Sequence, residues 1–310
     1  MMIWANLIHL SMNMWGDHVR PEGMANDDPF FFREKLQFED DCWEELLARM
    51  VAAGVNTVVI DLGDGVRYES HPEIAVKGAW TRAKLRRELK KMRRMGLEPI
   101  PKLNFSCCHD AWMGPYSRMV STDVYYAVCR DLIAEVADLF DRPRFFHLGM
   151  DEETFNHQRK RRYVVVRQYD LWWHDLLFYV REVERAGVRA WVWSDYIWHH
   201  HDEFLSTMPR SVVQSNWYYD LSFGPKSKYV APFLDLDRNG YEQIPTGSNW
   251  AAADNFERLV SFCARRIAPE RLLGFMQTSW KPTVKEYRRV HLDAIEKLAA
   301  ARAALEKHAR

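Results

Sequence analysis

The stretch HLGMDEET, residues 147–154, places three consecutive carboxylic acids directly after an apolar run that begins at Phe145. The run is typical of a buried strand. A charge at the end of such a strand needs water or a partner, because an unpaired charge is costly to bury. We therefore expect a central strand over residues 145–150, and we expect Asp151 and Glu152 to serve a site. For Glu153 we expect a solvated or helix-capping acid.

Strand-like and helix-like segments alternate on both sides of this stretch. Strands are predicted over residues 3–10, 56–62, 99–104, 145–150, 190–194, 211–216, 243–246 and 272–277. Helices are predicted over residues 40–53, 81–95, 123–140, 166–186 and 256–267, and from 283 almost to the end. The weakest elements are the helix between the fifth and sixth strands and the seventh strand.

Eight β units in strict β/α alternation predict a parallel sheet covered by helices on both faces. The count of eight favours a closed (β/α)8 barrel, the TIM-barrel form of the α/β class, over a doubly wound open sheet. Residues 1–310 are expected to form one domain, since such barrels commonly reach this size.

Composition narrows the function classes. Lys plus Arg and Asp plus Glu number 43 each, so the net charge is zero and gives no indication of nucleic acid as a partner. No apolar run reaches 18 residues, so no membrane span is predicted. The five cysteines lack a disulfide or zinc spacing and suggest a reduced interior. The N-terminal residues lack the features of a leader, which favours a cytoplasmic protein; a trimmed leader is the alternative.

No cofactor or metal is predicted. The run HHHD, residues 199–202, offers neighbouring rather than convergent ligands, so we interpret it as a solvated loop. The sequence does not indicate an oligomeric state.

The functional face of a barrel lies at the carboxyl ends of its strands. At these positions polar side chains recur beside aromatic rings, which suits a carbohydrate, because hydroxyls need hydrogen-bond partners and the C–H face of a pyranose packs on a ring. The alternative is that loops are polar and Trp is frequent, with 13 in the chain. The candidate binding residues are Asp64, Arg67, His109, Trp112, Asp195, Trp198, Asn216, Trp217, Tyr218, Asn249, Trp250 and Trp280.

Asp151 and Glu152 are the candidate catalytic pair. Cleavage of a glycosidic bond needs one acid to protonate the leaving oxygen and a second group to stabilise or attack the anomeric carbon. Two neighbouring carboxylates also push their pKa values apart. Adjacent strand residues point to opposite sides, so both acids reach one pocket only if the chain turns here.

The same residues resemble a known family. HLGMDE, residues 147–152, is similar to the His-x-Gly-x-Asp-Glu signature of glycoside hydrolase family 20, the β-N-acetylhexosaminidases. Other blocks are similar in family order and cover most of residues 40–255. They are NTVVIDLGDGVRYESHPEI (56–74), TRAKLRRELKKMRRMGLEPIPKLNFSCCH (81–109), WVWSDYIW (191–198), VVQSNW (212–217) and NGYEQIPTGSNW (239–250).

The resemblance implies a retaining, substrate-assisted glycosidase acting on terminal N-acetylhexosamine or related sugars. Glu152 would be the general acid and base, and Asp151 would orient the acetamide and stabilise an oxazolinium-like intermediate. His147 and His109 would support the acids by hydrogen bonding, and Trp280 would form part of the sugar-binding wall.

The sequence also departs from the family. The first strand lacks the sugar-gripping arginine, Lys102 and Asn104 stand where acids are usual, and no tyrosine follows the seventh strand. The customary acid near Trp280 is also missing. A carbohydrate-binding barrel without turnover is therefore one alternative. A barrel enzyme of other chemistry, such as a lyase or a metal-dependent hydrolase, is another.

Overall fold

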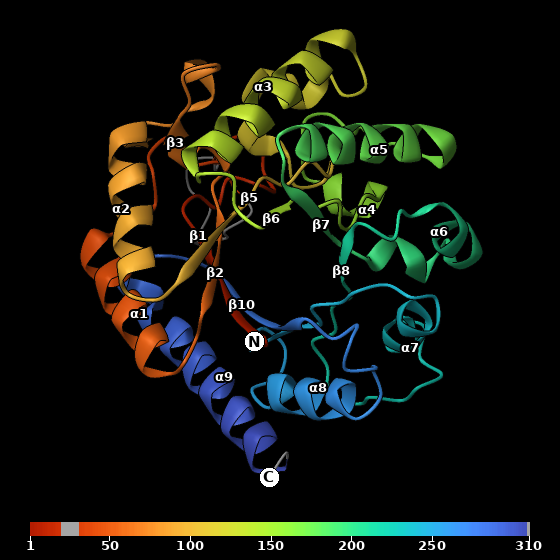
Figure 1. Cartoon of the computed structure of the whole chain (residues 1–310). Coiled ribbons are helices and arrows are strands. Elements are labelled where there is room, and N and C mark those ends of the chain that lie inside the picture. The colour runs from red at the N-terminus through yellow and green to blue at the C-terminus, as the bar shows by residue number, and fades with distance from the viewer. Residues whose placement is uncertain (20–30, 309–310) are drawn as a thin grey trace.

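The computed structural model describes residues 1–19 and 31–308. Its centre is a parallel sheet of eight strands, and the helices surround the strands on the outside (Figure 1). Across the sheet the strands are β8 (Val213–Ser215), β7 (Arg189–Trp193), β6 (Phe145–His147), β5 (Glu98–Lys102), β2 (Thr57–Asp61), β1 (Ile3–His9), β10 (Gly274–Pro282) and β9 (Thr246–Ser248). A separate two-stranded sheet pairs β3 (Val66–Arg67) with β4 (Trp80–Thr81).

The sheet closes on itself between its two outer strands. Bridges join Gln214 to Gln243 and Trp217 to Thr246. The backbone N–H of Ile244 donates to the carbonyl of Gln214 at 2.9 Å, and that of Thr246 to the carbonyl of Asn216 at 3.0 Å. The protein is therefore a (β/α)8 barrel, as the alternation of elements predicts.

Helices lie between successive strands of the barrel, and the last helix follows β10. They are α1 (Asp40–Ala52), α2 (Arg82–Arg94), α3 (Asp123–Leu139), α4 (Phe155–Gln158), α5 (Tyr169–Arg185), α6 (His201–Thr207), α7 (Ala231–Arg238), α8 (Asn255–Ala264) and α9 (Arg288–His308). Within the two described ranges, no helix is long and apolar enough to cross a bilayer.

Two apolar layers hold the barrel together. In β1, Ile3, Ala5 and Leu7 point into the barrel, where they join a cluster of strand side chains. Trp4 and Ile8 point outward into the larger cluster between strands and helices. All five are buried, as a strand covered on both faces requires.

The boundaries differ from the expected ones where backbone geometry interrupts the pattern. β6 ends at His147, because Gly149 and Met150 adopt a left-handed conformation. α6 has only seven residues, which explains the weak pattern between the fifth and sixth strands. α7 was not expected, because its buried residues are only Pro232, Phe233 and Leu236, which are too few to give a helical pattern in the sequence.

Candidate active site

The chain turns sharply after β6, at the carboxyl end of the barrel. Gly149, Met150 and Glu152 have φ values of +73°, +76° and +55°. A Cβ on Gly149 would lie 1.9 Å from Oδ1 of Asn104, so this position requires glycine. The turn brings Asp151 and Glu152 into the lining of one cavity. The expectation that both acids face one pocket through a turn is confirmed.

Asn104, which follows β5, fixes this turn. Its Nδ2 donates to Oδ1 of Asp151 at 2.8 Å. Its own Oδ1 accepts the backbone N–H groups of Ser106 at 3.1 Å and Met150 at 3.2 Å. The hydroxyl of Ser106 donates to the carbonyl of Asp151 at 2.5 Å. Both the oxygen and the nitrogen of the Asn104 amide are therefore hydrogen-bonded, and this fixed amide orients the Asp151 carboxylate.

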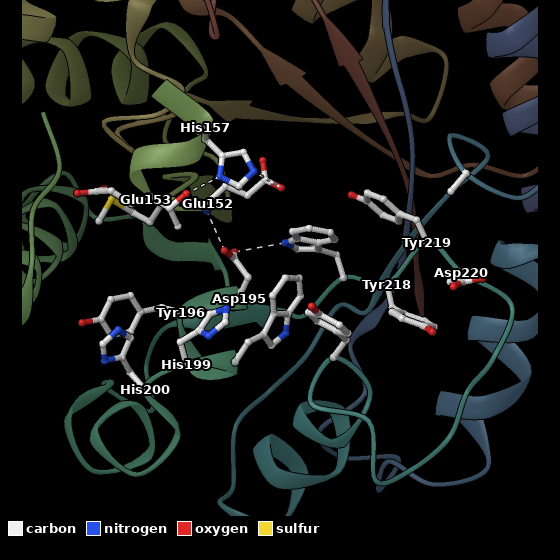
Figure 2. Close-up of a pocket in the computed structure, with 16 residues that line it drawn as sticks. Glu152, Glu153, His157, Asp195, Tyr196, His199, His200, Tyr218, Tyr219 and Asp220 are labelled. Atoms are coloured by element: carbon white, nitrogen blue, oxygen red, sulfur yellow. Dashed lines mark hydrogen bonds and ion pairs between the residues drawn. The ribbon is translucent and has the colours of Figure 1, made fainter. Parts of the chain in front are cut away.

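Two histidines approach the acid pair. Nδ1 of His109 lies 3.3 Å from Oδ1 of Asp151, and its Nε2 lies 3.5 Å from Oε2 of Glu152. On the other side, Nε2 of His157 lies 3.3 Å from Oε1 of Glu152 (Figure 2). Thr154 Oγ1 contacts the second nitrogen of His157 at 2.8 Å. Both carboxylate oxygens of Glu152 therefore face an imidazole.

The charges of this group are coupled. Burial alone would lower the pKa of His109, but the charges of Asp151 and Glu152 outweigh it and raise that pKa to about 10. The hydrogen bond to Glu152 raises the pKa of His157 above its ordinary value. Burial opposes ionisation of Glu152, yet the two imidazoles hold its pKa well below the usual range. Burial likewise opposes ionisation of Asp151, and His109 more than offsets it, so the pKa of Asp151 is lowered. At neutral pH the acids are ionised and His109 carries a proton between them.

Asp195, which follows β7, is a further acid of the site, and its side chain is buried. Its Oδ2 accepts the backbone N–H of Glu152 at 2.8 Å, and its Oδ1 accepts Nε1–H of Trp217 at 3.3 Å (Figure 2). Burial and the negative charge of Asp151 raise the pKa of Asp195 to about 7. Both of its oxygens are used within the protein.

Two cavities meet at Glu152. The smaller, of about 340 Å³, is lined by both acids and His109. The larger, of about 690 Å³, is lined by Glu152 and Asp195 but not by Asp151. The two share four lining residues, which are Glu152, His157, Trp217 and Tyr219.

The smaller cavity is walled by aromatic rings. Trp217 and Tyr219 stack at a ring separation of 4.9 Å and an angle of 29°. The indole N–H of Trp280 donates to the hydroxyl of Tyr219 at 3.1 Å, and both residues line the smaller cavity. Such a cage, with carboxylates on one side, suits a ligand that has apolar faces and a small number of polar groups. The remaining tryptophans of its wall are Trp15, Trp193 and Trp250.

Most of the residues expected at the strand ends line these cavities. The smaller cavity is lined by Asp151, His109, Trp250 and Trp280. The larger cavity is lined by Asp195, Trp198 and Tyr218. Glu152 and Trp217 line both cavities. Six expected residues do not line either cavity, namely Asp64, Arg67, Trp112, His147, Asn216 and Asn249.

Each of these exceptions has a structural reason. Asp64 is buried and accepts hydrogen bonds from Ser11 and Asn13, and burial raises its pKa to about 7. The indole N–H of Trp112 donates to the carbonyl of Asn104 at 3.0 Å, so its ring packs beneath the rim. Arg67 lies on the exposed side of the small sheet.

The other three exceptions make hydrogen bonds within the protein. His147 accepts the N–H of Gly149 at 3.0 Å and packs on two tryptophans, so the expected hydrogen bond to the acids is wrong. Asn216 accepts Nε1–H of Trp198 at 2.8 Å, and this orients a ring of the larger cavity. Asn249 donates to Asp293 at 2.9 Å, outside the site.

Glu153 is not the solvated or capping acid that was expected. Its side chain is only 2% exposed and pairs with Arg167 at 2.8 Å. Arg167 in turn pairs with buried Asp175 at 3.0 Å. The third acid of the run is therefore structural and ties the acid turn to α5.

Sequence reasoning missed His157, Tyr219 and Trp193. His157 lies five positions beyond Glu152, on the short helix α4, and no periodicity marks it. Tyr219 directly follows the expected Trp217 and Tyr218 in the loop after β8, so its place in this aromatic run was a usable signal. Tyr219 also supplies a tyrosine hydroxyl in the cavity, although none was expected from the loop after the seventh strand. His199 and His200, expected in a solvated loop, line the larger cavity.

One group in the described part of the chain has the ligand types for a metal ion. Its donor atoms belong to His109, Asp151 and Glu152 and lie within 4.8 Å of one another. In this arrangement both ring nitrogens of His109 already face carboxylates. A metal ion would have to displace the imidazolium proton before it could bind.

No family model and no curated protein matches the sequence. Several solved structures share the fold. An exo-β-N-acetylglucosaminidase of glycoside hydrolase family 20 from Vibrio harveyi, bound to N-acetylglucosamine, superposes with a TM-score of 0.64 at 14% identity, over 96% of this chain and 54% of that one. The family 20 β-N-acetylhexosaminidase from Streptomyces coelicolor A3(2) superposes with a TM-score of 0.65 at 15% identity. The match covers 96% of this chain and 64% of that one. The N-acetyl-β-hexosaminidase from Streptomyces plicatus, in complex with thio-NAglucal, superposes with a TM-score of 0.64 at 15% identity. The match covers 96% of this chain and 64% of that one. This chain thus spans between about half and two thirds of their lengths, and at such identities the likeness establishes the shared barrel.

Proposed function

We propose that the protein is a retaining glycoside hydrolase that removes a terminal N-acetylhexosamine or a related 2-acetamido sugar with assistance from the substrate. The observation that carries the proposal is the acid turn after β6, where Asp151 and Glu152 line one aromatic cavity. The fold shared with enzymes described as β-N-acetylhexosaminidases supports it.

The glycone occupies the smaller cavity in this mechanism. Asp151, held by Asn104 and His109, accepts the acetamide N–H and orients the acetamide oxygen toward the anomeric carbon. That oxygen attacks as the bond to the leaving oxygen breaks. The ionised Asp151 stabilises the positive charge that develops on the cyclic intermediate.

Glu152 carries the proton to the leaving oxygen. Because imidazoles flank both of its oxygens, the proton resides on the histidines in the free enzyme and passes through Glu152 during bond cleavage. Glu152 then removes a proton from the water that opens the intermediate. This step forms the hemiacetal product and returns Glu152 and the histidines to their starting protonation. Tyr219, which lines the same cavity, would donate its hydroxyl proton to the acetamide oxygen.

The test is hydrolysis of 4-nitrophenyl N-acetyl-β-glucosaminide and N-acetyl-β-galactosaminide, with the plain β-glucoside and β-galactoside as controls. We expect turnover of an acetamido substrate alone, because the attacking oxygen belongs to the substrate. Glu152→Gln should lower kcat by roughly 10²–10⁴-fold, and Asp151→Asn by about 10²-fold or more.

A non-catalytic sugar-binding barrel predicts a different pattern. It would bind an N-acetylglucosamine thiazoline inhibitor against Asp151 without turning over either aryl substrate. Unchanged turnover in Glu152→Gln would rule out the acid assignment.

A further inference from the structure

Arg161, in the loop after β6, is a buried cation that the proposed mechanism does not use. Its side chain is only 5% exposed, and it lines neither cavity. A buried charge is costly unless a counter-ion and hydrogen-bond partners satisfy it. The partners of Arg161 therefore show what its burial holds in place.

The guanidinium of Arg161 donates to two neighbouring loops at once. Toward the loop after β1, Nη2 donates to the carbonyl of Met14 at 2.9 Å, and Nε donates to the carbonyl of Trp15 at 3.1 Å. Toward the loop after β5, Nη1 donates to the carbonyl of Cys107 at 2.6 Å and to Oδ1 of Asp110 at 2.7 Å. All three nitrogens are used, and together they join the loops after β1, β5 and β6.

Each of these three loops carries a side chain that lines the smaller cavity. Trp15 comes from the loop after β1, and its own carbonyl is one of the acceptors. His109 comes from the loop after β5, immediately before Asp110. His157 comes from the loop after β6, four residues before Arg161. Because a guanidinium is a rigid, planar fork, it fixes the three loops relative to one another.

The short segment between His157 and Arg161 is itself held. The backbone N–H of Arg161 donates to the carbonyl of Gln158 at 2.8 Å. Oε1 of Gln158 in turn accepts the backbone N–H of Val165 at 2.7 Å. A displacement of Arg161 would therefore also move His157, whose Nε2 lies 3.3 Å from Oε1 of Glu152.

We infer that Arg161 is a positioning residue of the proposed active site, which ties together the loops that place Trp15, His109 and His157 around the acid pair. The role rests on the proposed function and adds to it a residue that does not touch the substrate. In the proposed mechanism the two histidines hold the proton for Glu152, and Trp15 belongs to the wall around the glycone. Loss of the tie should therefore impair both the proton transfer and the binding of the sugar.

The first test compares Arg161→Lys with Arg162→Lys. Lysine keeps the charge, but its compact ammonium does not reproduce the planar fork that serves two loops at once. Arg162 is exposed at the next position, so the identical change there is the matched control. With the aryl acetamido substrate that the unmodified protein hydrolyses, we expect Arg161→Lys to raise KM and to lower kcat. The loss in kcat should be roughly 10²-fold, the effect of a misplacement of about 1 Å. Arg162→Lys should change neither constant.

Chemical rescue separates positioning from a purely structural role. Arg161→Ala leaves a space beside Asp110 and the three carbonyls that a free guanidinium ion can fill. Guanidinium chloride at millimolar, non-denaturing concentration should restore at least part of the lost kcat, and ammonium chloride at the same concentration should not. Circular dichroism and urea unfolding establish that each variant is folded under the assay conditions.

The possible results bear on different conclusions. Equal kinetic constants in Arg161→Lys and Arg162→Lys would overturn the positioning role and leave the proposed function standing. A folded Arg161→Ala whose lost kcat does not respond to guanidinium would also overturn it, as would a failure of both Arg161 variants to fold, which would show a role in the fold alone. Absence of turnover by the unmodified protein would overturn the proposed function, and the role that rests on it.

Discussion

Asp195 and Glu152 are joined across two strand ends: Oδ2 of Asp195 accepts the backbone N–H of Glu152 at 2.8 Å. Glu152 has a φ of +55°, a left-handed conformation that costs a non-glycine residue about 1–2 kcal/mol. A hydrogen bond from its N–H to a carboxylate offsets part of this cost. Asp195 was expected to bind the sugar directly, whereas the geometry makes it a positioning residue for the proposed acid.

Asp195→Asn should therefore lower kcat without a comparable change in KM. An asparagine offers one acceptor oxygen where Asp195 accepts from both Glu152 and Trp217, so one donor is left unpaired. A reduction in kcat of roughly tenfold is expected, corresponding to about 1.4 kcal/mol. Asp202→Asn, at an exposed acid of α6, is the control. An unchanged kcat, or an effect confined to KM, would contradict the positioning role.

The His157–Glu152 pair predicts the pH dependence of hydrolysis. The pKa of His157 is raised by Glu152, so its proton is present below that pKa and is lost as pH rises through it. Activity should therefore fall on the alkaline side at a pH above the ordinary histidine value of 6.5. The groups facing Glu152 also include His109, whose pKa of about 10 keeps it protonated through this range.

In His157→Gln the alkaline limb should move to lower pH, since Glu152 no longer has this proton source. Glycosides with poor leaving groups should lose roughly tenfold or more in kcat. A dinitrophenyl glycoside, whose leaving group needs no proton, should be nearly unaffected. Measuring kcat against pH for both substrates checks this, and an equal loss for both would show that His157 has only a structural role.

Hydrolysis should not respond to a chelator. His109 is protonated at neutral pH, and each of its ring nitrogens faces a carboxylate, so it offers no lone pair to a metal ion. Activity is expected to be the same before and after dialysis against EDTA. A loss that added Zn²⁺ or Mn²⁺ restores would instead support the metal-dependent hydrolase that the sequence left open.

The ion-pair network beneath the acid turn should matter for stability. Arg167→Ala leaves Glu153 and Asp175 as buried carboxylates without their cation. Breaking a buried pair in this way typically costs about 3–5 kcal/mol. Arg130→Ala is the matched control, because Arg130 is exposed and its 3.6 Å contact with Glu182 should contribute at most about 1 kcal/mol. Urea unfolding of both variants would measure the difference, and similar losses in the two would contradict the interpretation.

The sequence predicted the barrel well because each strand is a continuous apolar run. Residues such as Leu7 and Val59 can be assigned to the core from this run alone, without tertiary contacts. The acid pair was also predictable, since Asp151 and Glu152 end such a run. The role of Glu153 was not, because the left-handed turn at Glu152 decides which way the next side chain points. His157 and Tyr219 lie on irregular loops, where position is set by tertiary contacts rather than by periodicity.

The pairing of β1 with β10 sets a condition on how the chain reaches its folded form. Ile3 is in register with Gly274, and the hydroxyl of Thr283 donates to the carbonyl of His9 across 274 residues of sequence. Contacts so far apart are slow to form, because a long loop must close before they contribute. During synthesis β1 must therefore wait, with one edge unpaired, until β10 has left the ribosome. An exposed strand edge of this kind invites aggregation, so dependence on chaperones is expected to be greatest just before β10 emerges.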